Sequence, residues 1–278
     1  MRLRLSISQI QTFLRCQRMW ALRYVEGLKI PPPGAALIGS LTERALEVAL
    51  LPVLEGKRPE PLDVVEDVFA EGFKEAKDLA DWRDDKPERL FEGARVALRG
   101  YHRKQVPKLR PVALQEKRSK FVAPAGVEVV GIADLREAAK IVDWKTSKRK
   151  ISTQRSRAYA VQLHTYQALW PQSEGLELHN LVLGREEPLI LPVEAEEDPE
   201  RVWALFWQVK TGIEIALRTG VFLPASLDHW ICSPKWCGFW DVCQSRDWRP
   251  EAWLEAHEDL DLGSLGARDL EEEEVEWL

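Results

Sequence analysis

The stretch GIADLREAAKIVDWKTSK, residues 131–148, places charged residues inside two runs that otherwise have the composition of buried β-strands. The runs 128–135 and 140–146 are short, rich in β-branched residues and separated by a turn, which predicts an antiparallel hairpin. We place the turn at the two consecutive alanines, Ala138 and Ala139. Residues whose numbers sum to 277 then pair across the hairpin, and this register sets Asp134 directly opposite Asp143.

Two carboxylates in this register lie about 5 Å apart and repel each other unless a cation sits between them. Lys145 lies two residues beyond Asp143 and shares its face of the strand, whereas Val142 and Trp144 face the other way, into the core. A surface hairpin with a salt bridge is the alternative, because an isolated D-x-K pattern is common by chance. In a buried hairpin, a metal that neutralises the acids is the better explanation.

The motifs GIAD, IVDWKTSK and QLHTY follow one another in this order. Together they resemble the PD-(D/E)XK nucleases of the RecB-like branch, whose pattern is G-x-x-D, then D/E-x-K, then Q-x-x-x-Y. The resemblance implies an α/β fold in which helices flank a small central mixed sheet. It also assigns the motif positions to Gly131 and Asp134, Asp143 and Lys145, and Gln162 and Tyr166.

The same resemblance implies a role for each residue of the hairpin. Asp134 and Asp143 would bind Mg²⁺ or Mn²⁺, with the Trp144 carbonyl as a further ligand, because hard divalent cations prefer oxygen ligands. The metal would lower the pKa of a bound water and stabilise charge on the scissile phosphate. Lys145 would orient that water or the phosphate.

Residues outside the hairpin complete the expected site. Gln162 and Tyr166 share one helix face and would contact the backbone of the nucleic acid strand. Many members carry a metal-binding histidine in a G-x-x-x-H pattern, but IGSLTERALE gives Gly39 followed by Glu43 at the histidine position. Glu43 is expected either to bind the metal or to be an ordinary solvated helix residue. Glu116 is a further candidate, and the histidines form no ligand pattern.

The four cysteines are Cys16, Cys232, Cys237 and Cys243, the last three in a C-x4-C-x5-C run. Buried thiols are one interpretation, and zinc sites usually have closer C-x2-C pairs. The resemblance extends to CRISPR-associated RecB-like and AddB-type nucleases and implies a 4Fe–4S cluster on these thiolates. The usual run there is C-x2-C-x5-C, so the first gap is wider here. Four aromatic residues are expected to shield the cluster: Trp230, Trp236, Phe239 and Trp240.

The remaining sequence predicts the elements around this core. A capping box of Ser8 and Gln11 predicts an N-terminal helix. Residues 61–108 are rich in helix formers and indicate a helical insertion. Residues 1–250 are expected to form the nuclease domain, and residues 251–278 an acidic tail. Periodicity also predicts helices at 36–51, 154–170 and 198–219, and strands at 113–123, 176–184 and 188–194.

Charge is unevenly distributed along the 278 residues, whose net charge is −6. Residues 95–160 hold 17 Lys and Arg against 5 Asp and Glu, whereas residues 251–278 hold 11 acids against Arg268. The basic middle is either a solvated face or a phosphate-binding surface. The tail either resembles acidic docking peptides, which suggests a protein partner, or is simply solvated. No apolar run reaches transmembrane length and no signal peptide is evident, so a cytoplasmic protein without membrane contact is expected.

These features predict a metal-dependent DNA nuclease, an exonuclease acting on DNA ends or single strands. The alternative is a catalytically inactive DNA-binding or scaffold subunit of a recombination, repair or replication complex. The expected catalytic residues Asp134, Asp143 and Lys145 are all present, which favours the enzyme.

Overall fold

The structure is a computed structural model that describes residues 3–196, 198–226 and 228–260. The chain divides into two compact units. Among the described residues, the first unit comprises 3–31, 119–130 and 198–260 without 227, and the second comprises 32–118 and 131–196. The predicted acidic tail lies outside the described residues from 261 onward.

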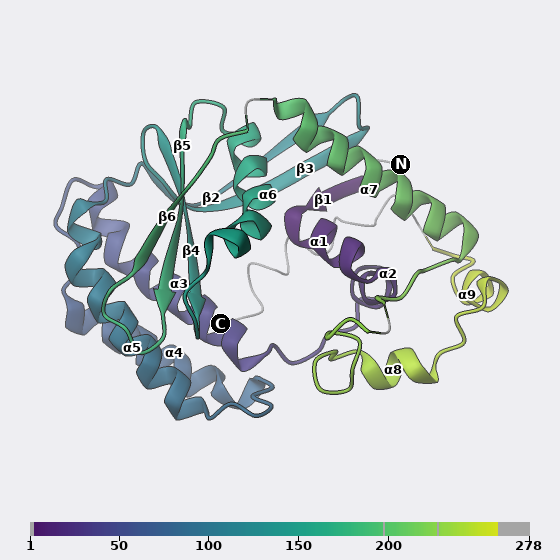
Figure 1. Cartoon of the computed structure of the whole chain (residues 1–278), viewed down its shortest axis with the longest axis horizontal. Helices are drawn as coiled ribbons and strands as arrows, with labels where there is room; N and C mark the ends of the chain where they lie inside the picture. The colour runs from purple at the N-terminus through teal and green to yellow at the C-terminus, as the bar shows by residue number, and fades with distance from the viewer. Residues whose placement is uncertain (1–2, 197, 227, 261–278) are drawn as a thin grey trace. The chain divides into compact units, whose positions relative to one another are not determined.

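The second unit is built on a mixed sheet (Figure 1). Its central strand β4 (Lys140–Ser147) pairs antiparallel with the end of β3 (Val127–Arg136) and parallel with β5 (Gly175–Val182). β6 (Leu189–Val193) then adds antiparallel to β5. A parallel pair requires a crossover connection, and α6 (Thr153–Leu169) supplies it between β4 and β5. The expected α/β fold with a mixed sheet is therefore confirmed.

The hairpin of β3 and β4 has the register that the sequence predicted. Leu135 pairs with Val142, and Arg136 pairs with Ile141, so the paired numbers sum to 277. Val142 and Trp144 are buried in the hydrophobic core, as expected. The alternation of side chains along β4 therefore directs its charged residues to the opposite face.

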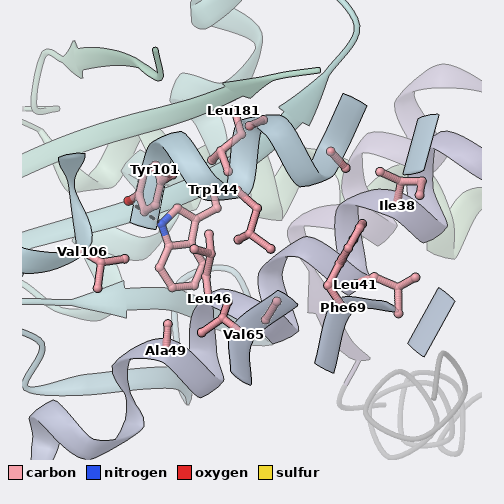
Figure 2. Close-up of a cluster of buried hydrophobic side chains, with 14 of the residues drawn as sticks. Ile38, Leu41, Leu46, Ala49, Val65, Phe69, Tyr101, Val106, Trp144 and Leu181 are labelled. Carbon is pink, nitrogen blue, oxygen red and sulfur yellow. Dashed lines mark hydrogen bonds between the residues drawn. The ribbon is translucent and has the colours of Figure 1, made fainter. Parts of the chain in front are cut away.

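Three helices cover the Val142 and Trp144 face: α3 (Gly34–Leu54), α4 (Leu62–Ala76) and α5 (Pro87–Lys104). Apolar residues at helical spacing on each of them bury one stripe, and each fully buried large side chain contributes about 1.5–3 kcal/mol. The predicted helical insertion thus forms part of the core of this unit. Figure 2 shows the cluster, which includes Ile38, Leu46, Val65, Phe69 and Tyr101.

The first unit starts with a short strand that the sequence did not predict. β1 (Leu3–Ser6) pairs in parallel with residues 127–130 of β3, and Leu3 and Leu5 are buried. Helix α1 (Ile7–Arg15) follows, capped by the Ser6 hydroxyl, which accepts a hydrogen bond from the Gln9 amide. The expected cap at Ser8 is therefore wrong, because pairing with β3 keeps the chain extended up to Ser6.

The rest of the first unit is largely helical. α7 (Pro199–Thr219) packs on α1 and begins at Asp198, whose side chain accepts from the Glu200 amide. It ends at Gly220, where φ is 69°, a left-handed conformation that favours glycine. The other elements are α2 (Gln17–Trp20), a π-helix (Ala21–Val25), α8 (Trp240–Ser245) and α9 (Pro250–Ala256). β2 (Ala113–Val122) pairs with β3, and the second unit also has 3₁₀ turns at Lys77–Leu79 and Val106–Lys108.

Among the residues that the structure describes, no helix combines the length and the apolar character that crossing a membrane requires.

Candidate active site

Asp134 and Asp143 lie in the second unit with little contact to solvent, at 8% and 1% exposed. The Lys145 ammonium lies 2.6 Å from Asp143 Oδ2. The Trp144 amide donates to Asp134 Oδ2 at 2.8 Å. The structure therefore brings both aspartates and the lysine together around one stretch of β4. The Lys145 Nζ also lies 5.9 Å from the centre of the Tyr159 ring of α6, which covers this face of the sheet (Figure 1).

Glu43 reaches the same cluster from α3. Burial, together with the neighbouring Asp134 and Asp143, raises its pKa to about 8 against the opposing effect of Lys145. Burial and the neighbouring Asp143 raise the pKa of Asp134 to about 7. Burial also raises the pKa of Asp143, against the effect of Lys145. These shifts mean that three carboxyls share one poorly solvated space with a single ammonium group.

The oxygen atoms of this cluster suit a divalent cation. Among the described residues, Asp143 Oδ1 is buried without a hydrogen-bonding partner, and Oδ2 has the Lys145 ion pair. The Trp144 carbonyl also faces the cluster, where it accepts from Lys145 Nζ at 3.2 Å. Within the described part of the chain, no three His, Cys, Asp or Glu side chains are arranged to hold a metal as they stand. The donor set of carboxylates and a carbonyl nevertheless fits Mg²⁺ or Mn²⁺.

Gln162 and Tyr166 lie next to each other on α6. Gln162 Nε2 donates to the Tyr166 hydroxyl at 2.7 Å, and burial together with the two aspartates raises the pKa of Tyr166. Gly131 explains how the tyrosine fits. A Cβ at this glycine would lie 2.8 Å from Leu169 and 3.0 Å from the Tyr166 ring. The absence of a side chain at Gly131 therefore lets α6 pack closely over β3.

Gln115 is a site residue that the sequence did not indicate. Its side chain hydrogen-bonds the Asp134 carboxylate, and its φ of 45° is left-handed, which is uncommon for a residue other than glycine. This conformation breaks the alternation of β2, so no periodicity could have revealed the contact. The neighbouring candidate Glu116 instead pairs with Arg136 at 2.6 Å. Burial raises the pKa of Glu116, but the hydrogen bond from Arg136 and the positive charges of Arg136 and Arg118 lower it below its ordinary value.

The comparison with protein families decides the identity of this fold. The model described as PD-(D/E)XK nuclease superfamily matches residues 4–244, which is most of the chain. The chain belongs to the PD-(D/E)XK nuclease superfamily. A comparison with curated protein sequences finds no significant match.

Two solved structures resemble this nuclease. One is the crystal structure of a protein from Eubacterium rectale described as a "putative exonuclease", with a TM-score of 0.56 and 14% identity. The match covers 82% of this chain and 86% of that one, and it supports the fold. The other is the crystal structure of SSO0001, with a TM-score of 0.38 and 14% identity over 79% of this chain and 89% of that one.

The stability of the metal-free nuclease is expected to fall as the pH rises from about 5 to about 8. In the unfolded chain, Glu43 and Asp134 ionise near their ordinary values of about 4. In the folded protein their pKa values are about 8 and about 7. Between these limits the folded state retains protons that the unfolded state has released, so each rise in pH favours unfolding. Saturating Mg²⁺ should oppose this fall by neutralising the carboxylates.

Thermal unfolding between about pH 5 and pH 9, with EDTA and with Mg²⁺, measures this effect. A melting temperature in EDTA that stays constant over this range would contradict the shared acidic site.

The four cysteines of the nuclease line one pocket in the first unit, with a volume of ≈ 170 Å³. Cys16 lies between α1 and α2, and the Met19 amide donates to its sulfur at 3.5 Å. None of the four forms a disulfide. Burial raises the pKa of Cys237 and of Cys243, so both are protonated thiols unless a metal displaces the proton.

The aromatic residues near the cysteines divide into two pairs. Phe239 and Trp240 line the pocket, as expected. Trp230 and Trp236 are 61% and 40% exposed and pack against each other edge to face at 5.9 Å between ring centres. These two rings contact each other and solvent and do not line the pocket, so shielding of a cluster by this pair stays a prediction.

Proposed function

We propose that this chain is a metal-dependent DNA nuclease of the RecB-like branch, an exonuclease that acts on DNA ends or single strands. The main support is the cluster of Glu43, Asp134 and Asp143 with Lys145, in which a buried carboxylate oxygen lacks a hydrogen-bonding partner among the described residues. Structural ion pairs do not require three acids around one lysine in a poorly solvated space, whereas a metal site does.

Each residue of the proposed site has a distinct task. Asp134, Asp143, Glu43 and the Trp144 carbonyl would hold Mg²⁺ or Mn²⁺. The bound metal would supply a water of lowered pKa and stabilise negative charge on the phosphate. Lys145 keeps its proton, because the surrounding carboxylates raise its pKa despite burial, so it acts as a cation that orients water or phosphate.

The positive charge that follows the site supports a nucleic acid substrate. Lys148, Arg149 and Lys150 are exposed in the loop after β4, only a few residues beyond Lys145. Exposed Lys and Arg side chains contact phosphates and release counterions from DNA, which makes binding dependent on salt. The description of the Eubacterium rectale protein as a "putative exonuclease" agrees with action at ends. The properties to be measured are DNA cleavage by this protein and its preference for single-stranded or duplex DNA.

The decisive experiment compares single-stranded linear, duplex linear and circular DNA, each incubated with the protein and Mg²⁺ or Mn²⁺. The proposal expects loss of the linear substrates in the presence of metal and no loss in EDTA. Circular DNA should persist, because an exonuclease needs an end. Metal-dependent DNA binding without cleavage would instead identify the protein as an inactive DNA-binding or scaffold subunit.

The metal preference gives a separate prediction about Glu43. A site made of oxygen ligands should support cleavage with Mg²⁺ at least as well as with Mn²⁺. Glu43→Ala should raise the Mg²⁺ concentration needed for half-maximal rate by about 10-fold or more, because a charged ligand is lost. A titration of cleavage rate against each metal measures this. Unchanged Mg²⁺ dependence in the variant would remove Glu43 from the ligand set.

We also propose that Cys16, Cys232, Cys237 and Cys243 hold a 4Fe–4S cluster. Their placement around one pocket supports a common ligand, and four thiolates satisfy such a cluster. The cluster would connect Cys16 to Cys232, which lie 216 residues apart in sequence, and thereby restrict the unfolded chain. Its role would be structural, since the acidic site holds the hydrolytic residues.

A further inference from the structure

Trp144 connects the proposed metal site to the core behind it. Its main chain contacts two residues of the proposed site: the amide donates to Asp134 Oδ2, and the carbonyl accepts from Lys145 Nζ. Its indole lies on the opposite face of β4, 1% exposed within the hydrophobic cluster (Figure 2). Any movement of the indole therefore moves main-chain atoms that the metal and its ligands use.

The indole is held by a chain of buried hydrogen bonds. Trp144 Nε1 donates to the Tyr101 hydroxyl at 2.8 Å. The same hydroxyl lies 2.6 Å from His179 Nδ1, and His179 Nε2 lies 2.8 Å from Glu177 Oε2. Glu177 also forms an ion pair with Lys140 at 3.0 Å. Tyr101 and His179 are buried, at 0% and 2% exposed, so water does not replace these partners.

The groups at the two ends set the direction of each hydrogen bond. The indole nitrogen can only donate, so the Tyr101 oxygen accepts from it. The Glu177 carboxylate can only accept, so His179 carries a proton on Nε2, and in the neutral ring Nδ1 accepts from the Tyr101 hydroxyl. Burial, opposed by Glu177, lowers the pKa of His179, which agrees with this neutral form. The indole nitrogen, the Tyr101 hydroxyl, both His179 nitrogens and Glu177 Oε2 thus each have a partner.

Two backbone features place the partners of Trp144. In the parallel pairing of β4 and β5, Trp144 lies opposite His179. Tyr101 is brought over them by α5, which approaches the turn after β5 very closely. A Cβ at Gly100 would come within 1.9 Å of the Glu186 carbonyl oxygen, and the Gly184 amide donates to the Gly93 carbonyl at 2.8 Å. The stretch expected from the sequence to be an insertion thus delivers a side chain to the back of the catalytic strand.

We propose that Tyr101 and His179 are positioning residues that hold the Trp144 indole and thereby set its main-chain amide and carbonyl for metal binding between Asp134 and Asp143. This inference rests on the proposed metal site. Neither residue is among the proposed metal ligands, and both act through the indole. Outer partners of metal ligands typically change metal affinity or activity by about 10- to 100-fold when they are removed.

The test is Tyr101→Phe, which removes the hydroxyl and keeps the ring. Binding of Mn²⁺ is measured directly by electron paramagnetic resonance of the free ion, and cleavage is measured against Mg²⁺ concentration. The proposal expects the dissociation constant for Mn²⁺ to rise by about 10-fold or more. Phe69→Leu is the matched control, because Phe69 is buried in the same cluster and takes no part in the hydrogen bonds. It should lower the melting temperature and leave Mn²⁺ affinity unchanged.

A second variant tests the route through the indole. Trp144→Phe removes the hydrogen-bond donor, so this single variant should already weaken Mn²⁺ binding. Adding Tyr101→Phe to it should then cause little further loss of Mn²⁺ affinity. Independent, additive losses would overturn the proposal, as would unchanged Mn²⁺ affinity in folded Tyr101→Phe. If the wild type binds Mn²⁺ without cutting DNA, the proposed function fails while the binding experiment still decides this inference. A wild type that binds no Mn²⁺ overturns both.

Discussion

Asp143→Asn is expected to abolish DNA cleavage while leaving the metal-free protein at least as stable as the wild type. The substitution removes a charged ligand from the metal, and a rate loss of about 1,000-fold or more corresponds to roughly 4 kcal/mol of transition-state stabilisation. It also removes a buried carboxyl that raises the pKa of both Glu43 and Asp134, so the repulsion in the metal-free site decreases. Loss of activity without loss of stability separates a catalytic role from a structural one.

The neighbouring residues extend this prediction. Alanine at Asp134 or at Asp143 should abolish cleavage and weaken metal binding. Lys145→Ala should abolish cleavage but largely spare metal binding, because the ammonium forms an ion pair with Asp143 and is not a ligand. Without this cation the carboxylates lose the charge that neutralises them, so the metal-free variant should melt at a lower temperature. Adding Mg²⁺ should restore its melting temperature.

Cleavage rates, Mn²⁺ binding and melting temperatures of these variants provide the measurements. Asp67→Asn is a suitable control, since it makes the same chemical change at an exposed position of α4. It should behave as the wild type in all three assays. Wild-type cleavage by the variants of Asp134, Asp143 and Lys145 would refute the assignment of the active site.

The second large effect is expected at Cys16. Protein purified without oxygen should be brown and contain about four irons per chain if the four thiolates hold a 4Fe–4S cluster. Cys16→Ala should then lose the cluster and much of the thermal stability, because the proposed cluster would tie α1 and α2 through Cys16 to the C-terminal segment that carries the other three cysteines. Cleavage should decline through disorder of the first unit, since the proposed hydrolytic residues lie in the second.

Elemental analysis separates the alternatives for the cysteines. Zinc would give colourless protein with about one metal per chain and a similar loss of stability on mutation. Four buried thiols would make Cys16→Ala a mild core substitution, with an effect of about 1 kcal/mol. Colourless, metal-free protein that still folds and cleaves DNA would rule out the cluster.

The sequence by itself determined the centre of this protein. Strand periodicity and the consecutive Ala138 and Ala139 predicted the hairpin and its register. The alternation of side chains along the strand then placed Asp143 and Lys145 on one face, and Val142 and Trp144 on the other. The long helices could also be predicted, because an amphipathic stripe is a local property of the chain. These features depend on residues close together in sequence, and local geometry is what a sequence pattern records.

Other features were decided only by the tertiary structure. Leu3 and Leu5 form a strand because residues 127–130 of β3 supply the pairing partner, which the N-terminal sequence does not indicate. The left-handed backbone of Gln115 interrupts the alternation of side chains along β2, so the strand pattern could not predict which face its side chain occupies. The Tyr101 hydroxyl reaches Trp144 because α5 packs closely on the turn after β5. Each of these contacts joins segments distant in sequence, and their distance is set by packing, which leaves no periodic signal in the chain.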